Sequence, residues 1–192
     1  MSMYELHSDI DIAGTPQDVW SVLVDFPAHS GWNPFIREIY GTAREGTSLK
    51  ICVRPPGAPR VRLRGTVLAA RPPQELRWRT RTLISGIFGA EHWFVLTPLS
   101  DREVRLHQSL RINGLISPFL RNRVDRNIYR GFREMNSALK GRVERSRQRT
   151  ESQPSQGDNV ARLESVLFPN SAPSIAVEES PAEPEVVRRG VR

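Results

Sequence analysis

One long amphipathic helix constrains the fold of this chain more than any other segment. Between residues 117 and 147, apolar residues recur at spacings of three and four, the period of a single apolar stripe on an α-helix. The stripe consists of Leu120, Val124, Ile128, Phe132, Met135, Leu139 and Val143. Ser117 is a suitable N-cap, and Pro118 suits the first turn. About 30 residues at ~1.5 Å each make a rod roughly 45 Å long, so the helix needs a wide apolar surface to pack on.

The residues before this helix predict that surface as an antiparallel sheet. Apolar and polar side chains alternate in several segments, and such alternation is typical of strands that are buried on one face. The predicted strands are 4–12, 36–42, 48–53, 60–70, 75–83, 87–97 and 103–113. The later connections carry turn residues and are too short for a helix, so these strands form successive hairpins. One face of the sheet is apolar, and the other is rich in arginine.

The order of these elements places the chain in the α+β class. Thr15 and Pro16 begin a short helix after the first strand, and a second helical turn covers residues 29–32. A curved antiparallel sheet of about seven strands then wraps around the long C-terminal helix, because each must bury its apolar side against the other. One helix cannot fill the hollow of such a sheet, so aromatic side chains or a cavity must occupy the rest.

The composition changes after the long helix. Residues 1–147 are predicted to form one domain, and residues 148–192 form a polar, Pro-rich tail that we expect to be largely disordered. Within the tail, residues 160–168 have the apolar spacing of a short helix, which could dock on the domain or on a partner.

The positive charge of the chain is concentrated on the long helix. The net charge is +7, and residues 117–149 alone contain 10 basic and 3 acidic residues, which is also +7. Arg123, Arg126, Arg130 and Arg133 lie away from the apolar stripe, where they could contact an anionic membrane or an acidic protein, or simply be solvated. Nucleic acid is not an expected partner, because no aromatic residues alternate with these arginines as a stacking platform would require.

The remaining composition predicts a cytoplasmic protein without a metal or a cofactor. Cys52 is the only cysteine, which excludes an internal disulfide and fits a reducing compartment. The N-terminal residues lack the features of a signal peptide, and no apolar run is long enough to span a membrane. The histidines, His7, His29, His92 and His107, are not at metal-ligand spacing. We attribute the excess of arginine over lysine to a GC-rich bacterial genome, and the sequence does not indicate an oligomeric state.

Five segments of the chain resemble one known superfamily. They read IAGTPQDVWSVLVDF at 12–26, GWNPF at 31–35, ELRW at 75–78, HWFVLTP at 92–98 and FREMNSALK at 132–140. Together they resemble the START-like superfamily (SRPBCC), in particular its polyketide cyclase/dehydrase and lipid-transport type. The resemblance implies a helix-grip fold, in which an elongated apolar cavity lies between the curved sheet and the C-terminal helix. Members bind lipids, sterols, polyketides, hormones or quinones, and some cyclise or dehydrate aromatic polyketides, so the fold alone does not fix the function.

The inner faces of the strands and of the long helix supply the residues that we expect to line this cavity. The candidates are Trp32, Phe35, Leu63, Trp78, His92, Phe94, Leu106, Gln108, Ile128, Phe132 and Met135. His92 could donate a hydrogen bond to a ligand carbonyl or act as a general acid/base, or it could be satisfied within the core. Gln108 could orient a ligand or bond to a neighbouring side chain. Both faces of the strand around His92 are apolar, so the alternation does not decide which face points inward.

Three functions are compatible with these residues. The first is the binding of an apolar or amphipathic small molecule, such as a lipid, a polyketide or a quinone, in the cavity. The second is a cyclase or dehydratase that acts on a polyketide-like substrate, with His92 as its candidate catalytic residue. The third is an interaction or membrane-surface module that uses the arginine face of the long helix. Few polar residues are expected to face the cavity, which favours binding over catalysis.

Overall fold

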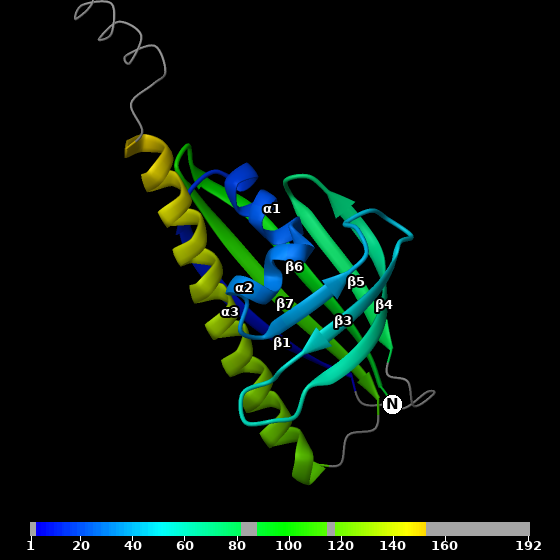
Figure 1. Ribbon diagram of the computed structural model, residues 1–192. Coiled ribbons are helices and arrows are strands. Elements are labelled where there is room, and N and C mark those ends of the chain that lie inside the picture. The colour runs from blue at the N-terminus through cyan, green and yellow to red at the C-terminus, as the bar shows by residue number, and fades with distance from the viewer. Residues whose placement is uncertain (1–2, 82–87, 115–117, 153–192) are drawn as a thin grey trace, which may run out of the picture. The chain divides into compact units, whose positions relative to one another are not determined.

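A curved sheet and one long helix make up most of the folded chain (Figure 1). The computed structural model describes residues 3–81, 88–114 and 118–152. The strands are β1 (Met3–Ala13), β2 (Ile36–Tyr40), β3 (Ser48–Val53), β4 (Val61–Arg71), β5 (Glu75–Arg81), β6 (Phe88–Ser100) and β7 (Glu103–Gly114). The helices are α1 (Pro16–Val24), the 3-10 turn η1 (Phe26–Ala28), α2 (His29–Trp32) and α3 (Pro118–Ser152). The strands form a seven-stranded sheet in the order β1-β7-β6-β5-β4-β3-β2.

This architecture confirms the predicted α+β helix-grip fold. Neighbouring strands are antiparallel throughout the sheet, and the short helices follow β1. Strand β2 ends at Tyr40 instead of continuing to residue 42, and two elements run several residues beyond their predicted ends. Strand β6 continues past Pro98, where its register against β7 shifts, and α3 continues past Arg147 to Ser152. Residues 153–192, which include the predicted short helix at 160–168, lie outside the described residues.

A capping box fixes the start of α1, directly after β1. The Thr15 hydroxyl accepts a hydrogen bond from the Asp18 backbone N–H at 3.2 Å, and the Asp18 carboxylate accepts one from the Thr15 backbone N–H at 2.8 Å. Val19, Trp20 and Leu23 form the buried stripe of this helix. The helix thus covers one end of the sheet and leads the chain into η1 and α2.

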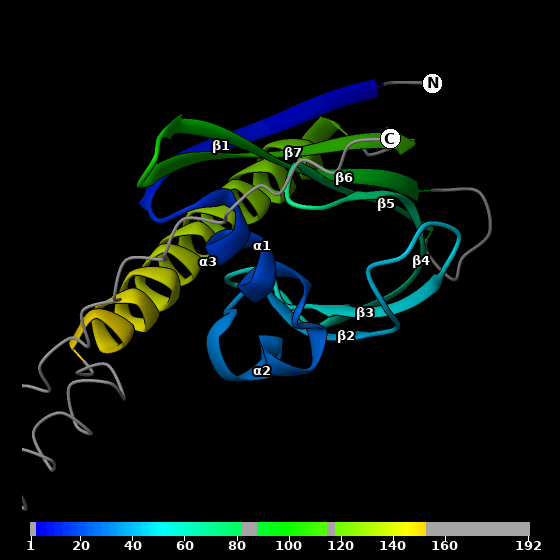
Figure 2. The same ribbon diagram turned by 90° about the horizontal axis from the view of Figure 1, so that it is seen from above.

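Helix α3 lies across the open side of the sheet. In Figure 2 the strands follow a U from β1, through β5 and β4, to β2, and α3 passes beside β1. Its apolar stripe is fully buried at Phe132, Met135, Leu139 and Val143, as the period of the sequence predicts.

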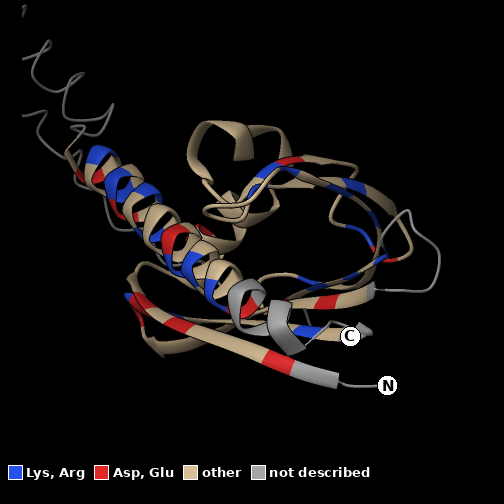
Figure 3. Cartoon of the chain, turned by 90° about the horizontal axis from the view of Figure 1, so that it is seen from below, with Lys and Arg blue, Asp and Glu red and all other residues tan. Residues whose placement is uncertain are grey.

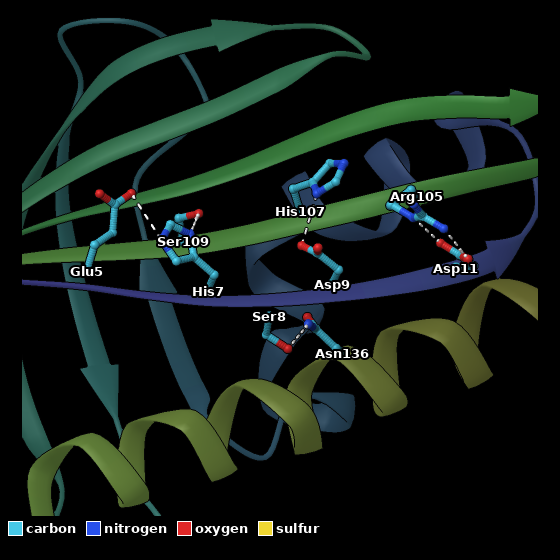
Figure 4. Close-up of polar contacts among 9 residues, drawn as sticks. All are labelled: Glu5, His7, Ser8, Asp9, Asp11, Arg105, His107, Ser109 and Asn136. Atoms are coloured by element: carbon cyan, nitrogen blue, oxygen red, sulfur yellow. Dashed lines mark hydrogen bonds and ion pairs between the residues drawn. The ribbon is translucent and has the colours of Figure 1, made fainter. Parts of the chain in front are cut away.

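Three hydrogen bonds hold α3 against β1. Asn136 donates from Nδ2 to the Ser8 hydroxyl at 3.2 Å, as Figure 4 shows. The Lys140 ammonium donates to the Asp11 backbone carbonyl at 2.6 Å. The Glu144 carboxylate accepts from the backbone N–H of Ala13 at 3.0 Å. Because α3 is held at the β1 edge, a hollow remains between the helix and the strands further along the U.

The outer face of β1 and β7 is a ladder of cross-strand polar pairs (Figure 4). Residues that are directly opposite in the register bond to each other, which is the favoured arrangement for opposite charges in a sheet. The pairs are Asp11 with Arg105, Asp9 with His107, His7 with Ser109 and Glu5 with Arg111. Each of these side chains therefore has a polar partner on the opposite strand.

Candidate ligand-binding site

A cavity of about 410 Å³ lies in the hollow between the sheet and α3. Its described walls come from Phe35, from strands β2 to β7, from the β3–β4 connection and from one turn of α3. None of the described residues in these walls carries a charge, and the polar ones are Thr80, His92 and Asn127. The volume is within the range of small-molecule sites, which are typically about 300–1,000 Å³ and largely apolar. The described walls suit a neutral ligand, because a charge placed against them would lose its hydration without gaining a counter-charge from these residues.

The structure places the candidate residues in two groups. Phe35, Leu63, Trp78, His92 and Ile128 lie in the cavity wall. Phe94, Leu106, Gln108, Phe132 and Met135 are fully buried and pack behind that wall. Trp32 is half-buried at the end of α2, where its ring centroid lies 4.8 Å from that of His29, so it belongs to neither group.

Several wall residues were not among the candidates. Leu110 and Ile112 share the inward parity of Leu106 and Gln108, so the alternation of β7 could have identified them. Pro55 and Ala58 come from the β3–β4 connection, whose conformation carries no periodic signal in the sequence.

His92 is the most buried polar group of the cavity wall. It is 5% exposed, and its ring stacks on Phe132 with centroids 5.1 Å apart and contacts the rings of Trp78 and Phe94. Burial lowers the pKa of His92 to about 3, because the charged imidazolium would lose its hydration. The imidazole is therefore neutral at pH values near 7, and its strand turns His92, Phe94 and Leu96 inward while Val95 is exposed.

Gln108 connects this histidine to α3. Its amide nitrogen Nε2 lies 2.9 Å from Nε2 of His92 and 3.6 Å from the sulfur of Met135. Its carbonyl oxygen Oε1 is buried and has no hydrogen-bond partner among the described residues. The amide thus uses its donors within the core and leaves its acceptor unused.

A second buried histidine lies at the other end of the sheet. His29 donates from Nε2 to the backbone carbonyl of Leu23 at 2.9 Å, and its Nδ1 accepts from Nδ2 of Asn33 at 3.2 Å. The Asn33 side-chain oxygen accepts from the backbone N–H groups of Phe35 and Ile36 at 3.0 and 2.8 Å. Burial lowers the pKa of His29 as well, so this histidine is a structural group that holds the segment leading to Phe35.

The basic face of α3 points away from the core. Lys and Arg positions, coloured blue in Figure 3, recur along the described part of α3. Arg126, Arg130 and Arg133 are exposed, and Arg130 bonds to Glu134 at 2.8 Å. The side chain of Arg123 lies outside the described part of the chain. Arg126, Arg130 and Arg133 are not among the residues that line the cavity.

The described residues contain no group of three or more His, Cys, Asp or Glu side chains that could hold a metal ion. None of the described helices is long and apolar enough to cross a membrane.

Comparison with known proteins identifies the family. Residues 3–144 match the family model described as polyketide cyclase / dehydrase and lipid transport. The chain belongs to this family. Membership agrees with the resemblance of the five sequence segments, and it accounts for a ligand-binding fold with a curved sheet and a long helix. No curated protein matches the sequence of this family member.

Solved structures share the fold at low sequence identity. A START superfamily protein from Mycobacterium smegmatis is 20% identical, with a TM-score of 0.59 over 73% of this chain and 97% of that protein. The Zhui aromatase/cyclase from Streptomyces sp. R1128 is 14% identical, with a TM-score of 0.62 over 75% and 95% of the two chains. Norcoclaurine synthase from Thalictrum flavum, in complex with dopamine and hydroxybenzaldehyde, is 12% identical, with a TM-score of 0.57 over 80% and 90%. At these identities the likeness shows the fold of this family member, and not its ligand.

Proposed function

We propose that this protein binds a neutral, largely apolar small molecule of the lipid, polyketide or quinone class in the cavity between the sheet and α3. The observation that carries the proposal is the cavity of about 410 Å³, whose described walls hold no charged residue. Burial of ~300 Å² of apolar ligand surface at roughly 25 cal/mol/Å² gives about 7.5 kcal/mol before the costs of association. That gain allows micromolar binding without any ionic contact.

A structure of the same fold supports the size and the aromatic character of such a ligand, although not its neutral charge. The norcoclaurine synthase structure holds dopamine and hydroxybenzaldehyde, which are small aromatic molecules. In this chain, the rings of Phe35 and Trp78 line the cavity and offer flat apolar surfaces to a comparable molecule.

The alternative is a cyclase or dehydratase that uses the same cavity. The name of the Zhui aromatase/cyclase and the description of the family support it. Efficient acid/base catalysis near neutral pH needs a group whose pKa is near 7, whereas that of His92 is lowered to about 3. We therefore favour binding, and a basic helix face that contacts anionic membranes or acidic proteins would be additional to it.

A neutral fluorescent probe tests the proposed function. N-phenyl-1-naphthylamine should brighten on binding to the wild-type protein, and Leu63→Trp should abolish the increase because the larger ring fills the cavity from β4. Thr66→Trp is the matched control, since Thr66 is exposed on the same strand and outside the cavity wall. Equal probe binding by wild-type protein and Leu63→Trp would place the site elsewhere.

Native mass spectrometry of protein purified from its own host, followed by organic extraction, would then identify the ligand class. A co-purifying neutral lipid, polyketide or quinone is the expected result. A co-purifying molecule with a charged group buried in the cavity would contradict the proposal.

A further inference from the structure

Met135, Gln108 and His92 lie in a row, and the first two determine which nitrogen of His92 carries its proton. The first is Met135 on α3, whose sulfur lies 3.6 Å from the Gln108 amide nitrogen. A thioether accepts hydrogen bonds and cannot donate them. The opposite orientation of the amide would place the Gln108 oxygen near this sulfur, so that two acceptors would face each other. The sulfur therefore favours the orientation in which the amide nitrogen faces Met135 and His92.

The amide orientation then fixes the imidazole tautomer. The Gln108 nitrogen lies 2.9 Å from Nε2 of His92, and an amide nitrogen can only donate, so Nε2 must accept. A neutral imidazole carries one proton, which therefore resides on Nδ1. The hydrogen bond that joins His92 to another described residue is the one at Nε2, which leaves Nδ1–H for other partners.

An N–H donor in an apolar wall is costly when it has no acceptor, and a ligand can supply one. His92 lines the cavity, whereas Gln108 and Met135 are fully buried behind it. The hydroxyl of Thr80, the neighbouring polar group of the wall, already donates to the backbone carbonyl of Ala90 at 3.3 Å. The described wall also offers donors in the half-buried amide of Asn127 and in the indole of Trp78. Nδ1–H of His92 is the donor that Gln108 and Met135 orient.

We propose that Nδ1–H of His92 donates a hydrogen bond to a carbonyl oxygen of the bound ligand, so that the cavity selects neutral ketones or quinones over hydrocarbons of the same shape. This inference rests on the proposed function and specifies the polar group that the apolar ligand must carry. His92 acts as the specificity-determining donor, and Gln108 and Met135 act as positioning residues that set its tautomer.

Two ligands of the same shape test the selection. 2-Acetylnaphthalene carries a carbonyl where 2-isopropenylnaphthalene carries a C=CH₂ group, and calorimetric titration gives the dissociation constant of each. The ketone should bind about 3- to 10-fold more tightly to the wild-type protein, which is the effect of one neutral hydrogen bond. His92→Phe keeps an aromatic ring among its neighbours and should bring the ratio to about one.

Two further variants, one in the cavity wall and one behind it, separate recognition of the carbonyl group from packing of the core. Leu63→Ala should weaken ketone and alkene by the same factor, which leaves their ratio unchanged. Met135→Leu keeps the approximate volume but removes the sulfur, so the amide can reverse and the ketone preference should fall. A role of Met135 in packing alone would change both affinities equally.

The tautomer can be measured directly in the ligand-free protein. The ¹⁵N spectrum of histidine-labelled protein should show a protonated Nδ1 and an unprotonated Nε2 for His92 at a pH near 7. The bound ketone should also show a lowered carbonyl stretching frequency, which is lost in His92→Phe. A protonated Nε2 would overturn the proposal, even if His92→Phe does not fold.

The outcomes distinguish this inference from the function on which it rests. If ketone and alkene bind equally tightly, or if His92→Phe keeps the ketone preference, the selection is wrong and the binding function stands. If neither ligand binds, and N-phenyl-1-naphthylamine does not bind either, the binding function and the inference both fail.

Discussion

The two buried histidines of this chain are bonded in different ways. His29 and His92 each pair with a side-chain amide, Asn33 in one case and Gln108 in the other. Around His29, both ring nitrogens and the amide oxygen have protein partners, and most of these are backbone groups. Around His92, the amide oxygen has no partner in the described part of the chain, and the ring is bonded to described residues at Nε2 alone, beside a cavity that it lines.

This difference indicates that His29 stabilises the fold and that His92 is available to a ligand. Backbone groups cannot move away from His29 and Asn33, so this network fixes a turn. The His92 network consists of side chains from β6, β7 and α3, and it ends at a cavity. A fully satisfied buried network rigidifies the structure, whereas an incomplete one has bonding capacity left for a partner.

The largest expected effect comes from breaking the complete network. Asn33→Ala removes the acceptor of two buried backbone N–H groups, those of Phe35 and Ile36. We expect the free energy of unfolding to fall by about 3–4 kcal/mol, because each buried donor left without a partner costs about 1–3 kcal/mol. Urea denaturation measures this loss.

Gln108→Leu is the matched control on the incomplete network. It has a similar volume and removes a buried oxygen that lacks a partner, so we expect a loss of only about 1 kcal/mol. Equal losses for Asn33→Ala and Gln108→Leu would show that the two networks do not differ as the comparison requires.

The next effect is the dependence of stability on pH. The unfolded chain protonates His92 near its ordinary pKa of 6.5, whereas the folded chain does so only near pH 3. The contribution of neutral His92 to the free energy of unfolding is therefore fully present above about pH 6.5 and is lost as the pH falls towards 3. Between about pH 7 and pH 5 the free energy of unfolding should fall by roughly 2 kcal/mol on account of His92.

Urea denaturation of the wild-type protein and of His92→Phe at about pH 7 and pH 5 measures the share of this loss that is due to His92. The variant should lose less stability on acidification, and the slope that remains should include His29, whose pKa is also lowered by burial. An identical pH dependence in both proteins would mean that His92 is not neutral in the folded state.

A third prediction concerns the volume of the cavity at Phe35. Gly131 on α3 faces Phe35, and a Cβ atom at this position would overlap the Phe35 ring. Because Phe35 lines the cavity, Gly131→Ala should push the ring into it, with a loss of about 1–3 kcal/mol in stability and weaker probe binding.

Gly141→Ala is the control on the same helix, since its Cβ would meet only the flexible end of Arg145. We expect it to leave the probe affinity unchanged and to stabilise α3 by up to about 1 kcal/mol through helix propensity. Unchanged probe binding in Gly131→Ala would show that the Phe35 ring does not control access to the cavity.

The sequence predicted the fold and the inward faces better than it predicted the networks. The alternation of β7 and the helical period of α3 depend on local spacing, which a sequence displays directly. The contact of His92, Gln108 and Met135 joins residues from three elements, so it depends on the register of β6 against β7 and on where α3 lies. His29 received no role from the sequence, because its partners are backbone groups whose positions follow from the turn itself.

The smallest effect is expected on the outer face of the sheet. Arg105 donates to both carboxylate oxygens of Asp11, at 2.6 and 2.8 Å, and this contact lowers the pKa of Asp11. Both side chains are open to water, so the unfolding midpoint of Asp11→Asn should match that of the wild-type protein at about 1 M salt and fall only slightly below it at low salt. A loss that persists at high salt would contradict this expectation. Water can replace Arg105 at Asp11 at little cost, whereas the apolar cavity wall around His92 offers its N–H few competing partners.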